Sequence, residues 1–115
     1  MDQIEELMQK SIELGKAIAQ SDIYKDFKKA EYDLFQDAEA RKLVEDLQKI
    51  KNEHRGKLMA GIEVTKEEEE KLQELEKTCI KNRQVLASNQ ANTNFQEFME
   101  QISGNIKNGI KSIDK

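Results

Sequence analysis

The apolar residues of this 115-residue chain recur at helical spacing from one end to the other, and the chain contains no proline. A spacing of three and four residues places apolar side chains on one face of an α-helix. Proline costs about 3 kcal/mol inside a helix, so its absence leaves long helical segments unbroken. The sequence therefore predicts an all-α fold, a bundle of about four to five amphipathic helices in which long helices run antiparallel.

The composition limits how such a bundle can be stabilised. Apolar residues make up 37% of the chain and charged residues another 37%, which is few apolar side chains for a globular domain. We expect a single domain over residues 1–115 that gains stability from a second subunit, so a homo-oligomer, a dimer or larger, is predicted. Other proteins of the cytoplasm are the remaining expected partners.

Charge and cysteine content exclude several classes of protein. The net charge of −4 does not favour general attraction to nucleic acid or to anionic lipid. A single cysteine, Cys79, rules out an internal disulfide and fits a reducing compartment. The acidic, amphipathic N-terminal stretch does not resemble a secretory signal, and no apolar run approaches the roughly 20 residues of a membrane span. We therefore expect a cytoplasmic protein with no membrane association.

Capping residues divide the first half of the chain into predicted helices. The first helix should cover residues 2–19, and Ser21 can cap a second helix over residues 22–35. Asp37 either caps a third helix or interrupts one continuous helix, and the sequence leaves these alternatives open. The third helix should fade across residues 56–61, where glycine interrupts the apolar pattern.

Two capping boxes are predicted in the second half. The sequence TKEE at residues 65–68 should start a fourth helix over residues 66–89, because the Thr hydroxyl and the Glu carboxylate can each bind the other's amide. A second box, with Thr93 as the cap and Gln96 three residues later, predicts the start of a last helix. The charge-free segment 84–96 is accordingly interpreted as a helix–helix corner that touches another surface.

The last predicted helix has the strongest apolar stripe. Its acidic residues come early and its lysines come late, as the helix dipole favours. Stripes of this kind lock together between helices without any polar chemistry. We expect this stripe to supply a self-association face, made of Phe95, Phe98, Met99, Ile102, Ile106 and Ile110.

Residues with catalytic potential are isolated. His54 is the only histidine, and nothing near it in sequence supplies an orienting partner and a nucleophile. Cys79 falls on an apolar stripe, where a free thiol behaves as a small hydrophobe. No phosphate loop, catalytic triad or metal-spaced ligand set is visible. We therefore predict a protein without enzymatic activity, cofactor or metal.

A run of basic residues offers the one candidate contact with nucleic acid. Acidic residues are interspersed along it, and aromatic side chains that would stack on bases are missing. A solvated helix face is the favoured interpretation, and direct nucleic-acid binding is not expected. The residues of this candidate RNA-contact patch are Lys49, Lys51, Arg55 and Lys57.

The order of these motifs is similar to that of a known family. An amphipathic helix precedes a turn with Ser21, then Tyr24 and Ala30, and then a D-x-E-A sequence at residues 37–40 that leads into a long helix. A Gly-containing loop, an acidic helix start and an Asn-rich segment before an Ile-rich last helix follow. Over nearly its whole length the chain resembles the YlbF/YmcA-like family of small bacterial proteins linked to competence, sporulation and biofilm control.

The resemblance implies an all-helical, self-associating protein that acts through partners as a regulatory accessory module. Some members resemble accessory subunits of a complex that influences RNA processing, which is the alternative function it implies. Those members are tied to cysteine-bound iron–sulfur clusters. The C-terminal sequence of this chain has no cysteine, and Cys79 lies mid-chain, so no cluster is carried over and the chain looks closer to the cysteine-poor members.

Overall fold

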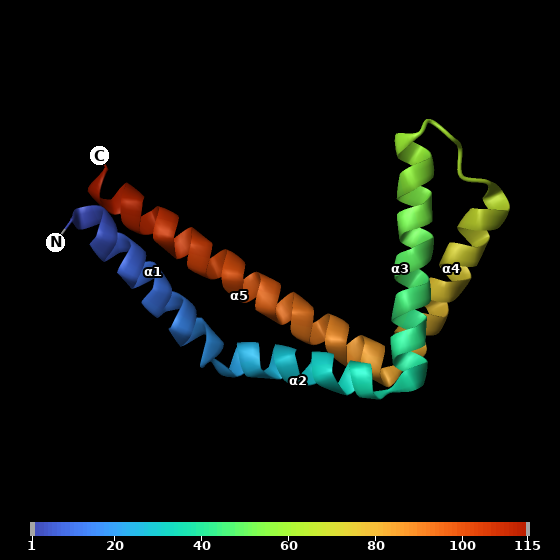
Figure 1. Ribbon diagram of the computed structural model, residues 1–115, viewed down its shortest axis with the longest axis horizontal. Coiled ribbons are helices and arrows are strands. Elements are labelled where there is room, and N and C mark those ends of the chain that lie inside the picture. Colours follow the sequence, from blue (N-terminus) through green and yellow to red (C-terminus); the bar gives the residue numbers. More distant parts are fainter. Residues whose placement is uncertain (1, 115) are drawn as a thin grey trace. The chain divides into compact units, whose positions relative to one another are not determined.

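The computed structural model describes residues 2–114, and it places them in five α-helices joined by short connections (Figure 1). No β-strand occurs within residues 2–114. The all-α prediction is therefore confirmed. In chain order the helices are α1 (Gln3–Ala19), α2 (Asp22–Gln36), α3 (Ala38–Met59), α4 (Lys66–Lys81) and α5 (Arg83–Ile113).

The contacts of the chain divide it into two compact units. The first unit combines the residues up to Lys29 with those from Ala91 onward, and the second covers Ala30–Gln90. Helices α2 and α5 each contribute residues to both units. The expectation of a single domain over residues 1–115 stays a prediction.

Capping side chains start the first three helices close to where the sequence predicts. Asp2 accepts a hydrogen bond from the amide of Ile4 at 3.1 Å, and the Ser21 hydroxyl accepts one from the amide of Tyr24 at 3.2 Å. Asp37 accepts from the amide of Ala40 at 3.0 Å. Its extended backbone, with φ −92° and ψ 107°, separates α2 from α3 and decides between the two alternatives that the sequence left open.

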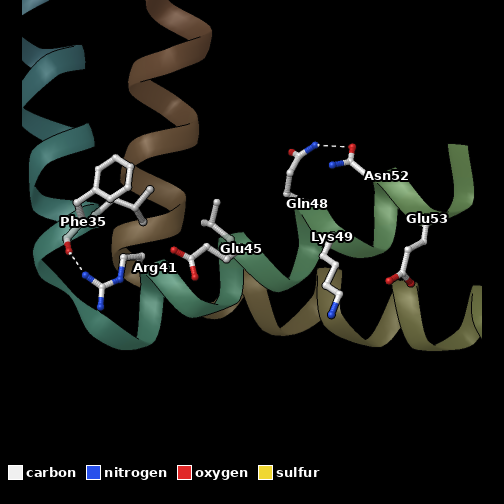
Figure 2. Close-up of a pocket in the computed structure, with 9 residues that line it drawn as sticks. Phe35, Arg41, Glu45, Gln48, Lys49, Asn52 and Glu53 are labelled. Atoms are coloured by element: carbon white, nitrogen blue, oxygen red, sulfur yellow. Dashed lines mark hydrogen bonds between the residues drawn. The ribbon is translucent and has the colours of Figure 1, made fainter. Parts of the chain in front are cut away.

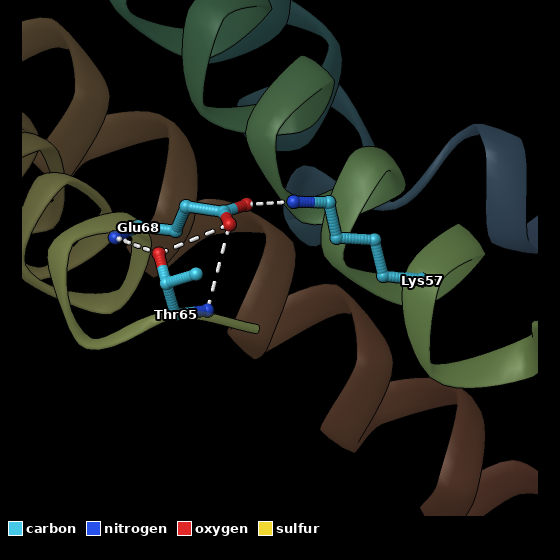
Figure 3. A network of polar contacts seen from close by, with 3 residues as sticks. All are labelled: Lys57, Thr65 and Glu68. Carbon is cyan, nitrogen blue, oxygen red and sulfur yellow. Dashed lines mark hydrogen bonds and ion pairs between the residues drawn. The ribbon is translucent and has the colours of Figure 1, made fainter. Parts of the chain in front are cut away.

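The loop between α3 and α4 is closed by hydrogen bonds at both ends. Helix α3 ends at Met59, and Gly61 follows with φ +75°, a conformation that glycine adopts without steric cost. The amide of Ile62 reaches back to the carbonyl of Lys57 at 2.8 Å, as in a Schellman motif. At the other end, the predicted Thr65–Glu68 capping box is present (Figure 3).

The second unit has a small core. Helices α3 and α4 pack against each other as an antiparallel hairpin, and the start of α5 adds Val85. Only small side chains are buried: Ala40, Cys79 and Val85. Larger apolar residues pack partly buried around them, namely Leu34, Leu43, Val44, Leu47 and Leu75. No large side chain among the described residues is fully buried, so much apolar surface stays in contact with solvent.

The predicted corner between residues 84 and 96 is wrong. Helix α4 ends at Lys81 rather than near residue 89, and α5 runs without a break through Thr93. The break lies at Asn82, whose side-chain oxygen accepts hydrogen bonds from the amides of Gln84 and Val85 at 3.0 and 3.1 Å. Asn is among the most favourable N-cap residues, which accounts for the helix start at Asn82. Inside a helix Asn costs only a few tenths of a kcal/mol, about 0.7 at most, so the asparagines within residues 84–96 do not interrupt α5.

The first unit pairs α1 and the beginning of α2 with the C-terminal part of α5. In Figure 1 the start of α1 lies beside the end of α5, and the two helices run in opposite directions. An aromatic cluster joins α2 to α5 in this unit. The ring of Phe95 stacks on Phe27 with centroids 5.0 Å apart and meets the edge of Tyr24 at 5.5 Å.

Candidate interaction surface

The apolar stripe of α5 is half-buried at one end and exposed at the other. Phe95 belongs to the aromatic cluster with Tyr24 and Phe27, so it packs within the chain. Phe98 and Ile102 are half-buried, and Met99 lies at the margin of exposure. The isoleucines that follow become steadily more exposed: Ile106 at 53%, Ile110 at 63% and Ile113 at 87%.

Helix α1 carries a second apolar face that the chain does not cover. Five of its large apolar side chains are exposed: Ile4, Leu7, Met8, Ile12 and Leu14. Ser11, which interrupts the stripe in sequence, donates its hydroxyl to the carbonyl of Leu7 at 2.8 Å. Because that hydrogen bond satisfies the hydroxyl within the helix, the serine is compatible with an apolar contact.

A groove runs along α3 in the second unit. It has a volume of about 670 Å³, and two rows of α3 side chains spaced by four residues line it together with the end of α2 (Figure 2). Its apolar part comes from Leu34, Phe35 and Val44, and Phe35 is 55% exposed. The polar lining consists of Arg41, Glu45, Gln48, Lys49, Asn52 and Glu53. Sequence reasoning missed this groove, because it treated the charges of α3 as a solvated face.

The four residues of the candidate RNA-contact patch do not share one face of α3. At about 100° per residue, Lys51 and Arg55 lie close in direction, whereas Lys49 and Lys57 point to other sides of the helix. Lys49 lines the groove along α3. Lys57 forms an ion pair with Glu68 across the α3–α4 hairpin (Figure 3). The structure therefore does not gather these cations into one basic surface.

The Lys57–Glu68 pair also sets the charge state at the start of α4. The hydrogen bond from Lys57, assisted by one from Thr65, holds the pKa of the Glu68 carboxyl below its usual value. The two side chains are 35% and 30% exposed, so water still reaches the pair. An exposed ion pair contributes little to stability, so we assign this pair to positioning the hairpin loop rather than to a reactive site.

The two candidate reactive residues lie apart in the second unit. Cys79 is 2% exposed and is part of the core, as its position on the stripe predicts. His54 is half-buried beside Leu58, Val64 and Leu72. Among residues 2–114, no group of three or more His, Cys, Asp or Glu side chains is arranged to hold a metal ion. Within the same range, no helix has both the length and the apolar character needed to cross a bilayer.

The described part of the chain is all-helical and carries large uncovered apolar faces, which are a common mark of surfaces that contact other proteins. The sequence model of the YlbF/YmcA family, described as control of the competence regulator ComK, matches residues 7–111 of this chain. The chain belongs to this family, which confirms the resemblance stated above.

Solved structures share the fold at low sequence identity. Bacillus subtilis RicA, in a crystal structure of its complex with RicF, matches with a TM-score of 0.81 and 19% identity over 99% of this chain and 100% of its own. A protein of unknown function (DUF964) from Bacillus stearothermophilus matches with a TM-score of 0.80 and 16% identity, over 95% and 96% respectively. No curated protein matches the chain.

Proposed function

We propose that the protein is a non-enzymatic regulatory module of competence control, which acts by binding other helical proteins, including its own copies, through α1 and α5. The family membership supports the regulatory role. The structural neighbour RicA was crystallised in complex with another protein, RicF, and we extend protein binding of this kind to the present chain.

The observation that carries the proposal is the pair of uncovered apolar faces in the first unit. Ile106 and Ile110 on α5, like Ile4 and Leu7 on α1, remain more than half exposed. Burying apolar area stabilises an interface by roughly 25 cal/mol per Å² before the costs of association are subtracted. A second helical pair that covers these faces would form a four-helix arrangement, with stripes packed against one another.

Two aspartates placed on the exposed stripe test the proposal. Changing Ile106 and Ile110 to Asp should raise the dissociation constant of the self-associated protein at least about 100-fold, because charges would be buried without partners. Both side chains are exposed in the single chain, so helicity by circular dichroism should be retained. Sedimentation equilibrium measures the change in mass.

A matched control places the same charges on the opposite side of α5. Gln101 and Asn108 are exposed and point away from the stripe, so Gln101→Asp with Asn108→Asp should leave the mass unchanged. If the isoleucine variant keeps the wild-type mass, or if both variants lose it equally, the stripe is not the association surface and the proposal fails.

A further inference from the structure

The groove along α3 lies between two ridges of side chains. Residues spaced by four form a ridge on the surface of a helix, and ridges of one helix pack into the grooves of another. One ridge is made of Val44, Gln48 and Asn52, in which the Gln48 amide donates to Asn52 at 3.0 Å. The other ridge, called the charged ridge below, is made of Arg41, Glu45, Lys49 and Glu53. Figure 2 shows Gln48 and Asn52 on one side of α3, and Lys49 and Glu53 on the other.

The charged ridge alternates in sign along α3, as positive, negative, positive and negative. Reversing its direction and placing it beside itself brings Arg41 opposite Glu53, and Glu45 opposite Lys49. Every position then faces the opposite charge. A copy placed parallel and in register would bring like charges together, which costs free energy. The ridge is therefore complementary to an antiparallel copy of itself.

The charges of this ridge are not used up within the chain. Arg41 donates a hydrogen bond to the carbonyl of Phe35 at 3.3 Å. Within residues 2–114, Glu45, Lys49 and Glu53 take part in no ion pair, although spacing by four would permit pairs along the helix. Their charged ends remain available to a partner.

The apolar part of the groove fits the same arrangement. Exposed Phe35 lies at the Arg41 end of the ridge, and the exposed Gly56 follows the ridge at its other end. A Cβ added at Gly56 would meet nothing within 4 Å, so the chain itself does not require glycine there. Glycine inside a helix costs roughly 1 kcal/mol relative to alanine, but it leaves room for an aromatic ring to approach. With Arg41 opposite Glu53, Gly56 of one copy lies level with position 38 of the other, next to the end of α2 that carries Phe35.

We propose that the groove along α3 is a self-association surface in which a second copy of this chain packs its α3 antiparallel. Arg41 then pairs with Glu53 of the partner subunit, and Glu45 pairs with the partner's Lys49, around a two-fold axis that crosses the groove at the level of residue 47 along α3. A two-fold contact of this kind repeats each pair twice. The ridge has no net charge, so a uniformly acidic or basic partner fits it less well. This contact is separate from the α1–α5 surface and goes beyond the proposed function.

A charge swap distinguishes contact between chains from a charge ladder within one helix. Glu45→Lys places like charges opposite each other at two symmetric positions, and it should weaken the α3 contact at least about 100-fold. Adding Lys49→Glu restores opposite charges between the chains. Within each helix, however, the two changes together place like charges four residues apart, at positions 41 and 45 and at positions 49 and 53. The double variant should therefore recover the association. Glu70→Lys, which makes the same change in net charge on exposed α4, is the control and should have no effect.

The measurement is sedimentation equilibrium in about 50 mM salt, with every change made in the Ile106→Asp, Ile110→Asp protein so that only the α3 contact remains. We expect a concentration-dependent dimer that Glu45→Lys dissociates and Glu45→Lys with Lys49→Glu restores, and that weakens as salt is raised. The inference is overturned if the Ile106→Asp, Ile110→Asp protein stays monomeric up to millimolar concentration. It is also overturned if adding Glu45→Lys has no effect on the dimer, or if Glu45→Lys with Lys49→Glu associates as weakly as Glu45→Lys alone. The proposed function fails on a different result, namely that the Ile106→Asp, Ile110→Asp protein has the same mass in solution as the wild-type protein.

Discussion

At the residue scale, Cys79 shows how burial lowers the reactivity of a thiol. Its thiol is nearly inaccessible and lies 3.8 Å from the carbonyl of Leu43, at the weak end of hydrogen bonding. Desolvation raises the pKa of the Cys79 thiol, with Glu76 and Asp46 adding to the increase and Lys51 opposing it. The thiolate is the nucleophile, so both inaccessibility and a higher pKa suppress its chemistry.

Labelling with a thiol-specific disulfide reagent checks this assignment. At pH 8 the folded protein should react at least about tenfold more slowly than the same protein in guanidinium chloride, because Cys79 is buried and burial raises the pKa of its thiol. The rate should rise with pH as the thiolate becomes populated. A folded protein that reacts as fast as the unfolded one would show that Cys79 is accessible, and the core described for the second unit would be incorrect.

At the element scale, Asn82 shows what the sequence could and could not reveal. The caps at Ser21, Asp37 and Thr65 were readable, because each is a local motif next to an apolar stripe. Asn82 fell inside the fourth helix predicted over residues 66–89, since its three-residue spacing from Cys79 fits a helix as well as a cap. A preferred N-cap residue followed directly by the start of a new helix was the available signal.

Alanine substitutions at Asn82 and at Thr93 decide which of these two residues starts α5. Asn82→Ala removes the acceptor for two amides at the start of α5, and it should lower the free energy of unfolding by about 1 kcal/mol. Thr93→Ala should be neutral or slightly stabilising, because Thr93 is exposed inside α5 and alanine favours helix. Urea denaturation followed by circular dichroism gives both values. The reverse order would place the helix start at Thr93, as the sequence alone suggested.

At the scale of the whole molecule, the fold class and family were predictable because helical periodicity pervades the chain. The distribution of exposure along α5 was not, because periodicity shows which side chains share a face and not which of them their own chain covers. Phe95 and Ile110 occupy the same stripe, yet one stacks on Phe27 and the other is left exposed. The groove along α3 was equally hidden, because it depends on how the end of α2 meets α3.

The most direct test of the account is the mass of the wild-type protein in solution, measured by sedimentation equilibrium over a range of micromolar concentrations. We expect a mass that is a multiple of 13.3 kDa and that falls only on dilution, because the apolar faces of α1 and α5 need a covering partner. A folded protein that stays at 13.3 kDa at every concentration would contradict self-association as the role of these faces.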